Sequence, residues 1–286
     1  MDARHARDVR RRLQAGSRGH RPEEASGERD ARVQDPRQVG ATIAAENLAA
    51  AAGRLRAASS IVVFTGAGVS AESGIPTYRS GSDGLWSRQN LERFANPAGY
   101  AAHLPESYDW YRARARGVAG CHPNPAHLAI AELADIVPDF VLVTQNIDSL
   151  HQRAGSRDVI ELHGNLREFR CAACGRRVTW DEAPEAPTCA SCGGMLRPGV
   201  VMFNENLPEA ALARARAAAE RCDVLLSVGT SNQVYPAAEL PMIALSSGRT
   251  VIIVNPDLTD QPFHRNVIGI HGRAGDTLPM LLDLLR

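Results

Sequence analysis

The feature that most constrains the fold is a set of four short apolar segments that alternate with stretches of helical composition. Apolar runs of this length are typical of strands that are buried on both faces. Strands that alternate with helices form a parallel sheet covered by helices on both sides. We therefore predict an α/β fold, a doubly wound, Rossmann-like parallel sheet that binds ligands at the carboxyl ends of its strands. The predicted strands are 61–65, 140–146, 222–229 and 250–255, and the helical stretches are 41–58, 127–134, 208–220 and 237–246.

Three segments do not follow this alternation. Residues 1–38 contain ten Arg and seven Asp or Glu but few large apolar side chains, so we predict a disordered tail, with a targeting signal as the alternative. Residues 77–126 are rich in Arg and aromatic side chains and are predicted to form a helical insertion. Residues 169–197 contain four cysteines and are predicted to form a small zinc-binding module. Residues 39–168 and 198–286, which include the helical insertion, are assigned to the Rossmann-like domain.

The charge balance of the chain excludes several kinds of partner. Its 32 basic and 32 acidic residues give a formal net charge of zero, which provides no electrostatic footprint for nucleic acid or for an anionic membrane surface. No apolar stretch approaches the roughly 20 residues needed to cross a bilayer, and the first residues lack the apolar centre of a secretory signal. We expect a cytoplasmic protein without nucleic-acid or membrane partners.

Four of the six cysteines form two closely spaced pairs, Cys171 with Cys174 and Cys189 with Cys192, separated by 14 residues. Two C-x-x-C pairs at about this distance are typical of a tetrahedral zinc site. Four thiolates complete the coordination shell and leave no position for an activated water, so we predict one structural Zn2+ per chain. Four unrelated reduced thiols are the alternative.

The first predicted strand runs into a glycine-containing turn, "GAGVSAESGIPTYRS", which starts at Gly66. Gly66, Gly68 and Ala71 match the dinucleotide fingerprint G-x-G-x-x-G/A, although a plain strand-to-helix turn gives the same short pattern. Hydride-transferring enzymes carry an acidic residue about 20 positions further on, at the end of the next strand. Here Asp83 lies in the loop-like segment "RSGSDGLW". Because Gly and Pro follow the turn closely, we predict a loop over the dinucleotide instead of a regular helix.

Several motifs, taken in their order along the chain, resemble those of the sirtuins, the NAD-dependent protein lysine deacylases. The motifs are "GAGVSAESGIPTYRS", "TQNIDSLHQRAG", "ELHG", the two C-x-x-C pairs, "GTS" and "VNPD". The likeness covers about residues 41–286. It implies that NAD is consumed and does not serve in hydride transfer, and that acylated-lysine proteins or peptides are the substrates.

The resemblance also implies the site residues. His163 in "ELHG" is implied to be the general base that acts on a ribose hydroxyl, work suited to a group that titrates near neutrality, whereas a lone His in a turn is often structural. Asn146 and Asp148 are implied to be catalytic, with turn and cap chemistry as the alternative. For Gly229, a simple turn at the end of a strand is the alternative to NAD binding. The implied NAD-binding residues are Gly66, Ala67, Gly68, Ser70, Ala71, Arg79, Gln145, Asn146, Ile147, Asp148, Gly229, Thr230, Ser231, Asn255, Pro256, Asp257 and Ala274.

Tyr111 and Arg114 occupy positions i and i+3 of a predicted helix, so they share one face. Sirtuins that prefer succinyl, malonyl or glutaryl lysine carry Tyr-x-x-Arg in this insertion. A guanidinium together with a phenol hydroxyl can hold the carboxylate of such an acyl group. We therefore expect the chain to resemble the class III, desuccinylase-type members. A solvated, Arg-rich helix face is the alternative.

The segment "RPGVVMFNENLP" resembles the stretch to which the family adds the substrate peptide as an extra strand, and it supplies Val200 and Val201 as predicted substrate-binding residues. Family members usually carry Trp or Phe at Met202 and Gly at Asn204. Because Asn is the non-glycine residue that best tolerates positive φ, we expect the backbone to keep its geometry there. The acyl tunnel and the peptide cleft are expected to differ in shape.

The resemblance predicts a deacylase that forms nicotinamide, free lysine and 2′-O-acyl-ADP-ribose, with acetyl and succinyl or malonyl as acyl groups. An ADP-ribosyltransferase or NAD hydrolase that uses the same site is one alternative. A non-catalytic NAD-sensing or zinc-dependent binding module is another, and the presence of His163 and Asn146 speaks against it.

Overall fold

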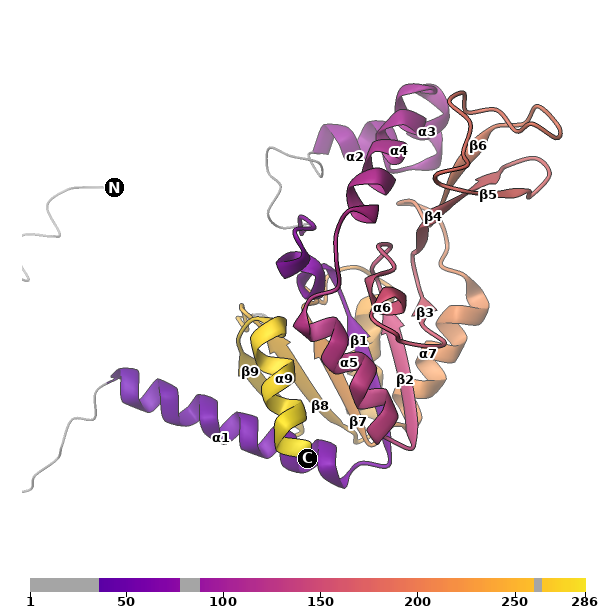
Figure 1. Cartoon of the computed structure of the whole chain (residues 1–286). Coiled ribbons are helices and arrows are strands. Elements are labelled where there is room, and N and C mark those ends of the chain that lie inside the picture. Colours follow the sequence, from indigo (N-terminus) through magenta and orange to yellow (C-terminus); the bar gives the residue numbers. More distant parts are fainter. Residues whose placement is uncertain (1–35, 78–87, 260–263) are drawn as a thin grey trace, which may run out of the picture. The chain divides into compact units, whose positions relative to one another are not determined.

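A six-stranded parallel sheet forms the centre of the larger part of the fold (Figure 1). A computed structural model describes residues 36–77, 88–259 and 264–286, and Gly40–Arg286 form one compact unit. All neighbouring strands of this sheet run parallel. In sheet order the strands are β3 (Ile160–Glu161), β2 (Asp139–Thr144), β1 (Ser60–Thr65), β7 (Val224–Val228), β8 (Thr250–Asn255) and β9 (Val267–His271).

The strand order reverses between β1 and β7. From β1 the chain moves outward to β2 and β3, and it later crosses to β7 on the other side of β1. In an open α/β sheet, this reversal creates a crevice at the carboxyl ends of the two strands, where ligands bind. The turns after β1 and β7 therefore meet at the position where a ligand is expected.

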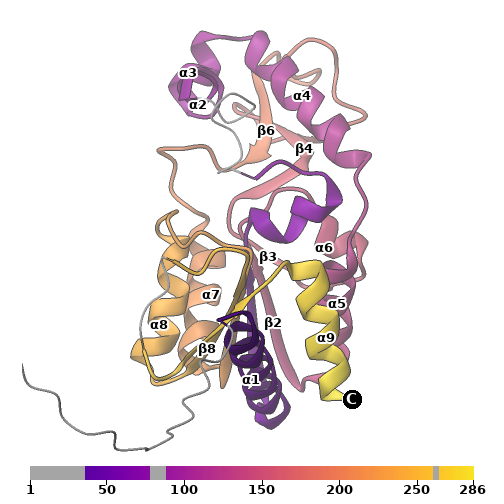
Figure 2. The ribbon, with the colours of Figure 1, turned by 90° about the vertical axis from the view of Figure 1, so that its left-hand side faces the viewer.

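Two apolar cores lie on opposite faces of the sheet, because successive side chains of a strand point to opposite sides. In β1, Ile61 and Val63 belong to the core under three of the helices, whereas Val62 and Phe64 belong to the core under two others. Figure 2 shows these helices on the two sides of the sheet. The first core is covered by α1 (Pro36–Ala57), α5 (Pro125–Ile136) and α9 (Ala274–Leu285), and the second by α7 (Glu209–Arg221) and α8 (Leu240–Ser246).

A second, smaller layer contains a three-stranded antiparallel sheet and three helices, with a core of its own. Two buried tyrosines connect the helices to a strand and to the loop that precedes it. The hydroxyl of Tyr100 donates to the carbonyl oxygen of Leu196 over 2.8 Å, and that of Tyr108 donates to the carbonyl oxygen of Pro184 over 2.7 Å. The sheet order is β5 (Arg177–Thr179), β4 (Gly164–Cys171) and β6 (Leu196–Val200), and the helices are α2 (Arg88–Phe94), α3 (Pro97–Ala102) and α4 (Glu106–Ala119).

The parallel sheet with helices on both faces confirms the predicted fold class. The small sheet extends beyond the predicted module of 169–197, because β4 begins at Gly164 and β6 ends at Val200. The first 35 residues of the predicted tail lie outside the described residues, and α1 begins within that tail, at Pro36. Proline is tolerated in the first turn of a helix because its missing N–H has no intrahelical partner there. None of the described helices has the length and apolarity needed to cross a membrane.

Candidate active site

A pocket of about 850 Å³ opens at the carboxyl ends of the central strands and is bounded on its other side by the small sheet and α4. Its lining combines the turn after β1, the segment after β2, the turn after β7 and residues 200–205, which are the end of β6 and the segment that follows it. This is the position that the reversal of strand order favours for a ligand. The predicted site residues can therefore be placed relative to one cavity.

The turn after β1 packs backbone to backbone against the turn after β7. The N–H of Gly68 donates to the carbonyl oxygen of Gly229 over 2.8 Å. A Cβ at Gly68 would lie 2.7 Å from both Cα and O of Gly229, which itself has φ of 60°. The close contact between the two turns therefore requires glycine at position 68, whether or not a ligand is bound. The chain continues as a 3₁₀ helix, η1 (Ala67–Ser73), which agrees with the prediction that no regular α-helix follows the turn.

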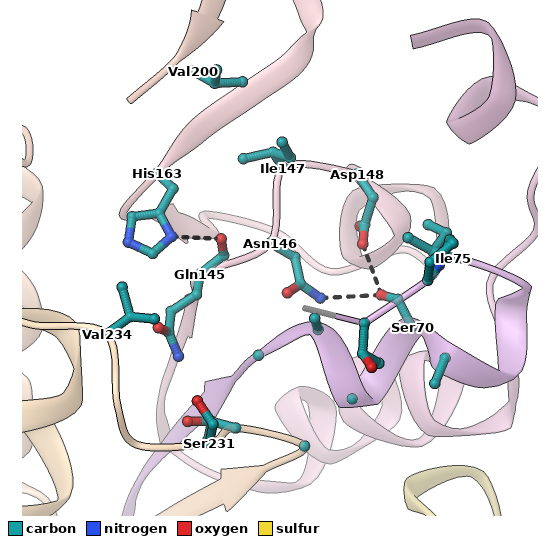
Figure 3. A pocket seen from close by; sticks show the side chains of 18 of the residues that line it. Ser70, Ile75, Gln145, Asn146, Ile147, Asp148, His163, Val200, Ser231 and Val234 are labelled. Atoms are coloured by element: carbon teal, nitrogen blue, oxygen red, sulfur yellow. Dashed lines mark hydrogen bonds between the residues drawn. The ribbon is translucent and has the colours of Figure 1, made fainter. Parts of the chain in front are cut away.

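Ser70 connects Asn146 and Asp148 through its hydroxyl group. Its Oγ donates to Asp148 Oδ2 over 2.7 Å and accepts from Asn146 Nδ2 over 3.1 Å. Figure 3 shows the amide oxygen of Asn146 turned away from Ser70. Burial raises the pKa of Asp148, and hydrogen bonds from Leu150 and Ser70 counteract this shift. The network therefore fixes which end of the Asn146 amide faces the pocket.

Two buried histidines lie behind this network and were not identified from the sequence. His127 Nδ1 accepts from the N–H of Asn124 over 3.3 Å, which leaves the proton on Nε2, 3.3 Å from Ser70 Oγ. His151 Nε2 lies 2.9 Å from Thr65 Oγ1, and the two rings are 4.9 Å apart. Burial lowers the pKa of His127 to about 4, and burial with the nearby His127 lowers that of His151 to about 3. Both rings are therefore neutral at physiological pH.

His163 is held in one tautomer by the backbone. Its Nδ1 lies 2.8 Å from the carbonyl oxygen of Gln145, and since a carbonyl only accepts, Nδ1 carries the proton (Figure 3). The lone pair is then on Nε2. Burial lowers the pKa of His163, and the hydrogen bond to Gln145 partly opposes this shift. His163 lines the pocket as a neutral imidazole that can accept a proton.

Tyr111 and Arg114 both project from α4 into the lining of the pocket. The guanidinium carbon of Arg114 lies 4.6 Å from the centre of the Trp110 ring, so cation–π attraction restrains it. Burial lowers the pKa of Arg114 to about 10, which leaves it charged at neutral pH. Burial raises the pKa of Tyr111 to about 12, so its hydroxyl keeps its proton. The pair offers one positive charge and one donor hydroxyl.

The four cysteines of the two C-x-x-C pairs come together at one end of the small sheet, where their sulfur atoms all lie within 4.8 Å of one another. Sulfurs at about 2.3 Å from a tetrahedral zinc are separated by about 3.8 Å. The Sγ atoms of Cys174 and Cys189 are 3.8 Å apart, and those of Cys171 and Cys192 are 3.5 Å apart. The donor set and its spacing therefore fit Zn2+.

Nearly all predicted NAD-binding residues line this one pocket. The exception is Arg79, which lies outside the described residues. Of the loop predicted to cover the dinucleotide, Ile75, Pro76 and Thr77 line the pocket, and the chain from residue 78 lies outside the described residues. Val200 and Val201 also line the pocket, on the side of the small sheet. The lining includes Gly66, Ala67, Gly68, Ser70, Ala71, Gln145, Asn146, Ile147, Asp148, Gly229, Thr230, Ser231, Asn255, Pro256, Asp257 and Ala274.

Comparison with known proteins agrees with this arrangement. The family model described as Sir2 family matches residues 66–236. The chain belongs to the Sir2 family. Among its Sir2 relatives, the NAD-dependent protein deacylase of Methylococcus capsulatus is 47% identical, with 81% of this chain and 94% of the relative covered. NAD-dependent protein deacylase 1 of Pseudomonas aeruginosa is 48% identical, with 80% and 95% covered.

Solved Sir2 structures show the same fold. One is a complex of a Sir2 homologue with NAD, 43% identical, with 83% of this chain and 93% of that chain covered and a TM-score of 0.76. Another is Sir2Af2 bound to a myristoylated histone peptide, 36% identical, with 84% and 97% covered and a TM-score of 0.68. The Sir2 fold is therefore shared over most of this chain.

Two positions where this Sir2-family chain departs from the usual sequence are accommodated differently. Asn204 adopts φ of 68°, as expected for a residue that replaces glycine. Met202 is 4% exposed and packs in the core of the small layer while also lining the pocket. The flexible thioether thus occupies the position of the usual aromatic ring.

Proposed function

We propose that this member of the Sir2 family is an NAD-dependent protein lysine deacylase. The observation that carries the proposal is the neutral His163, with its lone pair on Nε2, in the same pocket as the Ser70–Asn146–Asp148 network. The relatives named NAD-dependent protein deacylase, at 47% and 48% identity, support the same activity. The products are nicotinamide, free lysine and 2′-O-acyl-ADP-ribose.

Each residue has a role that follows from its chemistry. Bound NAD supplies an activated ribose that accepts the acyl group when nicotinamide leaves. Asn146 presents its amide oxygen, oriented by Ser70, to the nicotinamide half of the dinucleotide. His163 Nε2 accepts the proton of a ribose hydroxyl, and the hydrogen bond from Nδ1 to Gln145 stabilises the cation that forms. No Ser or Cys nucleophile is needed.

The other half of the dinucleotide is assigned to the turns after β7 and β8 and to the start of α9. Gly229, Thr230 and Ser231 directly follow β7, and Asn255 ends β8. Such strand ends bring backbone N–H groups close to ribose and phosphate oxygens. Ala274, the first residue of α9, is proposed to lie near the adenine.

The four cysteines are proposed to hold a structural Zn2+. All four sulfurs would be used, so the metal offers no open position and takes no part in the reaction. Its place between β4 and the loop before β6 lets it fix the small layer that forms one wall of the pocket. Cytoplasmic location is proposed as well, because a cluster of reduced thiols suits a reducing compartment.

We further propose that acyl groups with a terminal carboxylate are preferred over acetyl, as in desuccinylases and demalonylases. Arg114 and Tyr111 support this, since they bring a positive charge and a hydroxyl into a largely apolar pocket. A carboxylate held by a guanidinium forms strong charge-assisted hydrogen bonds. Acetyl offers no such group.

Mass spectrometry of the products formed from NAD and a panel of acyl-lysine peptides tests the proposed function. We expect equal amounts of nicotinamide, deacylated peptide and acyl-ADP-ribose, and their formation should be about 10²–10⁴-fold slower with a His163→Ala variant. Nicotinamide release that does not depend on an acylated peptide would instead indicate an NAD hydrolase or ADP-ribosyltransferase. Binding of NAD without any turnover would contradict enzymatic activity.

A further inference from the structure

A two-point ion pair lies beside the pocket, on the side of the small sheet. Arg197 Nη1 and Nη2 lie 2.6 and 2.7 Å from Glu205 Oε1 and Oε2, respectively. The two side chains are only 13% and 21% exposed. A planar guanidinium that meets both carboxylate oxygens has one preferred geometry, so such a pair fixes the two backbones that carry it.

The ion pair closes a turn of the chain that lines the pocket. Glu205 Oε2 also accepts from the N–H of Met202 over 2.8 Å, and the N–H of Glu205 donates to the carbonyl oxygen of Met202 over 3.1 Å. Asn204, between them, has φ of 68°. All six residues of 200–205 line the pocket. The carboxylate therefore holds a strained, functional turn in place.

Backbone hydrogen bonds to neighbouring elements also hold this segment. The N–H of Val201 donates to the carbonyl oxygen of His163 over 2.8 Å, and the N–H of Phe203 donates to that of Ala95 over 2.8 Å. Within the described sheet β6 pairs only with β4, so the segment continues from an edge strand. An extended peptide binds such an edge through main-chain hydrogen bonds, which depend on the exact position of each backbone group.

The pair also affects the charge around Tyr111 and Arg114, the part of the pocket that is proposed to bind the acyl group. Burial raises the pKa of Tyr111, the positive charges of Arg114 and Arg197 lower it, and the negative charge of Glu205 raises it. Because their charges oppose each other, Arg114 supplies the net positive charge beside Tyr111. Loss of either member would leave the other charge uncompensated near the acyl group.

We propose that Arg197 and Glu205 are positioning residues for the acyl-lysine peptide: their ion pair sets the shape of the turn 202–205 that receives the peptide. This inference rests on the proposed deacylase function. The turns that hold NAD, after β1 and β7, are joined by bonds of their own and do not depend on the pair. The pair therefore acts on the peptide and leaves the binding of NAD unchanged.

Steady-state kinetics and NAD binding of Glu205→Gln and Arg197→Met, in the full-length zinc-loaded protein, test the inference. We expect kcat/KM for the acyl peptide to fall at least tenfold, mainly through KM, and the Kd for NAD to stay within twofold. The ratio of succinyl to acetyl activity should rise in Glu205→Gln, which leaves Arg197 uncompensated, and fall in Arg197→Met. A purely structural role would not move this ratio in opposite directions.

A matched control is the exposed pair of Arg177 and Glu168 on the same small sheet, 3.1 Å apart with Arg177 69% exposed. Arg177→Met should change neither constant. If the first variants do not fold, Arg197→Lys and Glu205→Asp keep both charges but lose the two-point geometry. These variants should melt at the same temperature as the wild type and still show a raised KM for the peptide.

Unchanged peptide KM in folded variants, or an equal loss of NAD affinity, would overturn the inference. Failure of the proposed function looks different, because the wild-type protein would then release no nicotinamide with any acyl peptide. Turnover by the wild type together with insensitive variants would refute only the role of the ion pair.

Discussion

The Nδ1 atom of His163 lies 2.8 Å from the backbone carbonyl oxygen of Gln145. Gln145 directly follows β2, and its N–H donates to the carbonyl oxygen of Thr65 at the end of β1. The tautomer of the proposed base is therefore set by the central strands and not by another side chain. This arrangement links the protonation of His163 to the parallel sheet.

The first prediction concerns the pH dependence of the reaction. Burial lowers the pKa of His163 below its ordinary value of 6.5, and the base works only when neutral. Activity should therefore be lost as pH falls through a value below 6.5, and kcat/KM should be constant just above it. His163→Ala should lower the rate by about 10²–10⁴-fold. An acidic limb centred above pH 7 would contradict this assignment.

The second prediction concerns Ser70. Removing its hydroxyl in Ser70→Ala leaves the Asn146 amide and the Asp148 carboxyl without their shared partner. Each buried polar group that loses its partner costs about 1–3 kcal/mol. We expect a lower free energy of unfolding in urea and a reduced kcat. Ser247→Ala, at an exposed position, is the control, and equal behaviour of the two variants would refute the role of the network.

The third prediction concerns acid stability. The pKa values of His127 and His151 are lowered by burial to about 4 and about 3 from 6.5, so below pH 6.5 the unfolded chain binds protons that the native chain does not. Stability should then decrease as pH falls from 6.5 towards 4, by about 1.4 kcal/mol per pH unit for each histidine. Urea unfolding at several pH values measures this slope.

A variant series assigns that slope to the buried pair. His151→Gln should make the dependence less steep by about the share of one histidine, whereas His122→Gln, at an exposed position, should leave it unchanged. The same slope in all three proteins would show that other groups cause the loss of stability.

The fourth prediction concerns the acyl group. Arg114→Met should lower kcat/KM for succinyl-lysine peptides by about ten- to a hundredfold, since hydrogen bonds to charged groups contribute about 1.5–3 kcal/mol. Activity on acetyl-lysine should stay within about twofold, and Tyr111→Phe should have a smaller effect of the same kind. Arg116→Met, at an exposed position on the same helix, is the control. Equal losses for both acyl groups would remove the carboxylate clamp.

The fifth prediction concerns Gly68. In Gly68→Ala the new methyl would lie 2.7 Å from the backbone of Gly229, so the two turns must separate. We expect weaker NAD binding by calorimetry and a loss of about 1–3 kcal/mol in stability. Gly53→Ala is the opposite case, because nothing lies within 4 Å of the Cβ that the substitution would add on α1. That substitution should stabilise the protein by about 0.5–1 kcal/mol.

The core strands could be predicted from the sequence because each is a continuous apolar run. The predicted strand at 250–255 coincides with β8, whose four central residues are buried. β9 was missed, since its residues are mostly half-buried at the sheet edge, and β3 is only two residues long. Short or edge strands bury too little apolar surface to leave a pattern in the sequence.

The site could be predicted only as far as its motifs extend. His127 lies 57 residues from Ser70 in the chain, and His151 lies 86 residues from Thr65. Such pairs meet because β1 and η1 lie beside α5 and the short helix α6 (Leu150–Arg153) in the fold, which no local pattern reveals. The one local signal was "PNPAH", in which Asn124 caps α5 and meets His127 three positions later. The pairing of Arg197 with Glu205 likewise could not be predicted from the sequence, because it depends on the shape of the turn between them.

The contact between Gly68 and Gly229 gives one wall of the pocket a surface made of backbone. Such a wall has no rotamers to restrict when a nucleotide arrives, so its formation adds no side-chain entropy cost to binding. It is prepared before the ligand enters. Adaptation to different ligands then falls to the opposite wall, where the side chains of Arg114, Met202 and Phe203 have rotatable bonds.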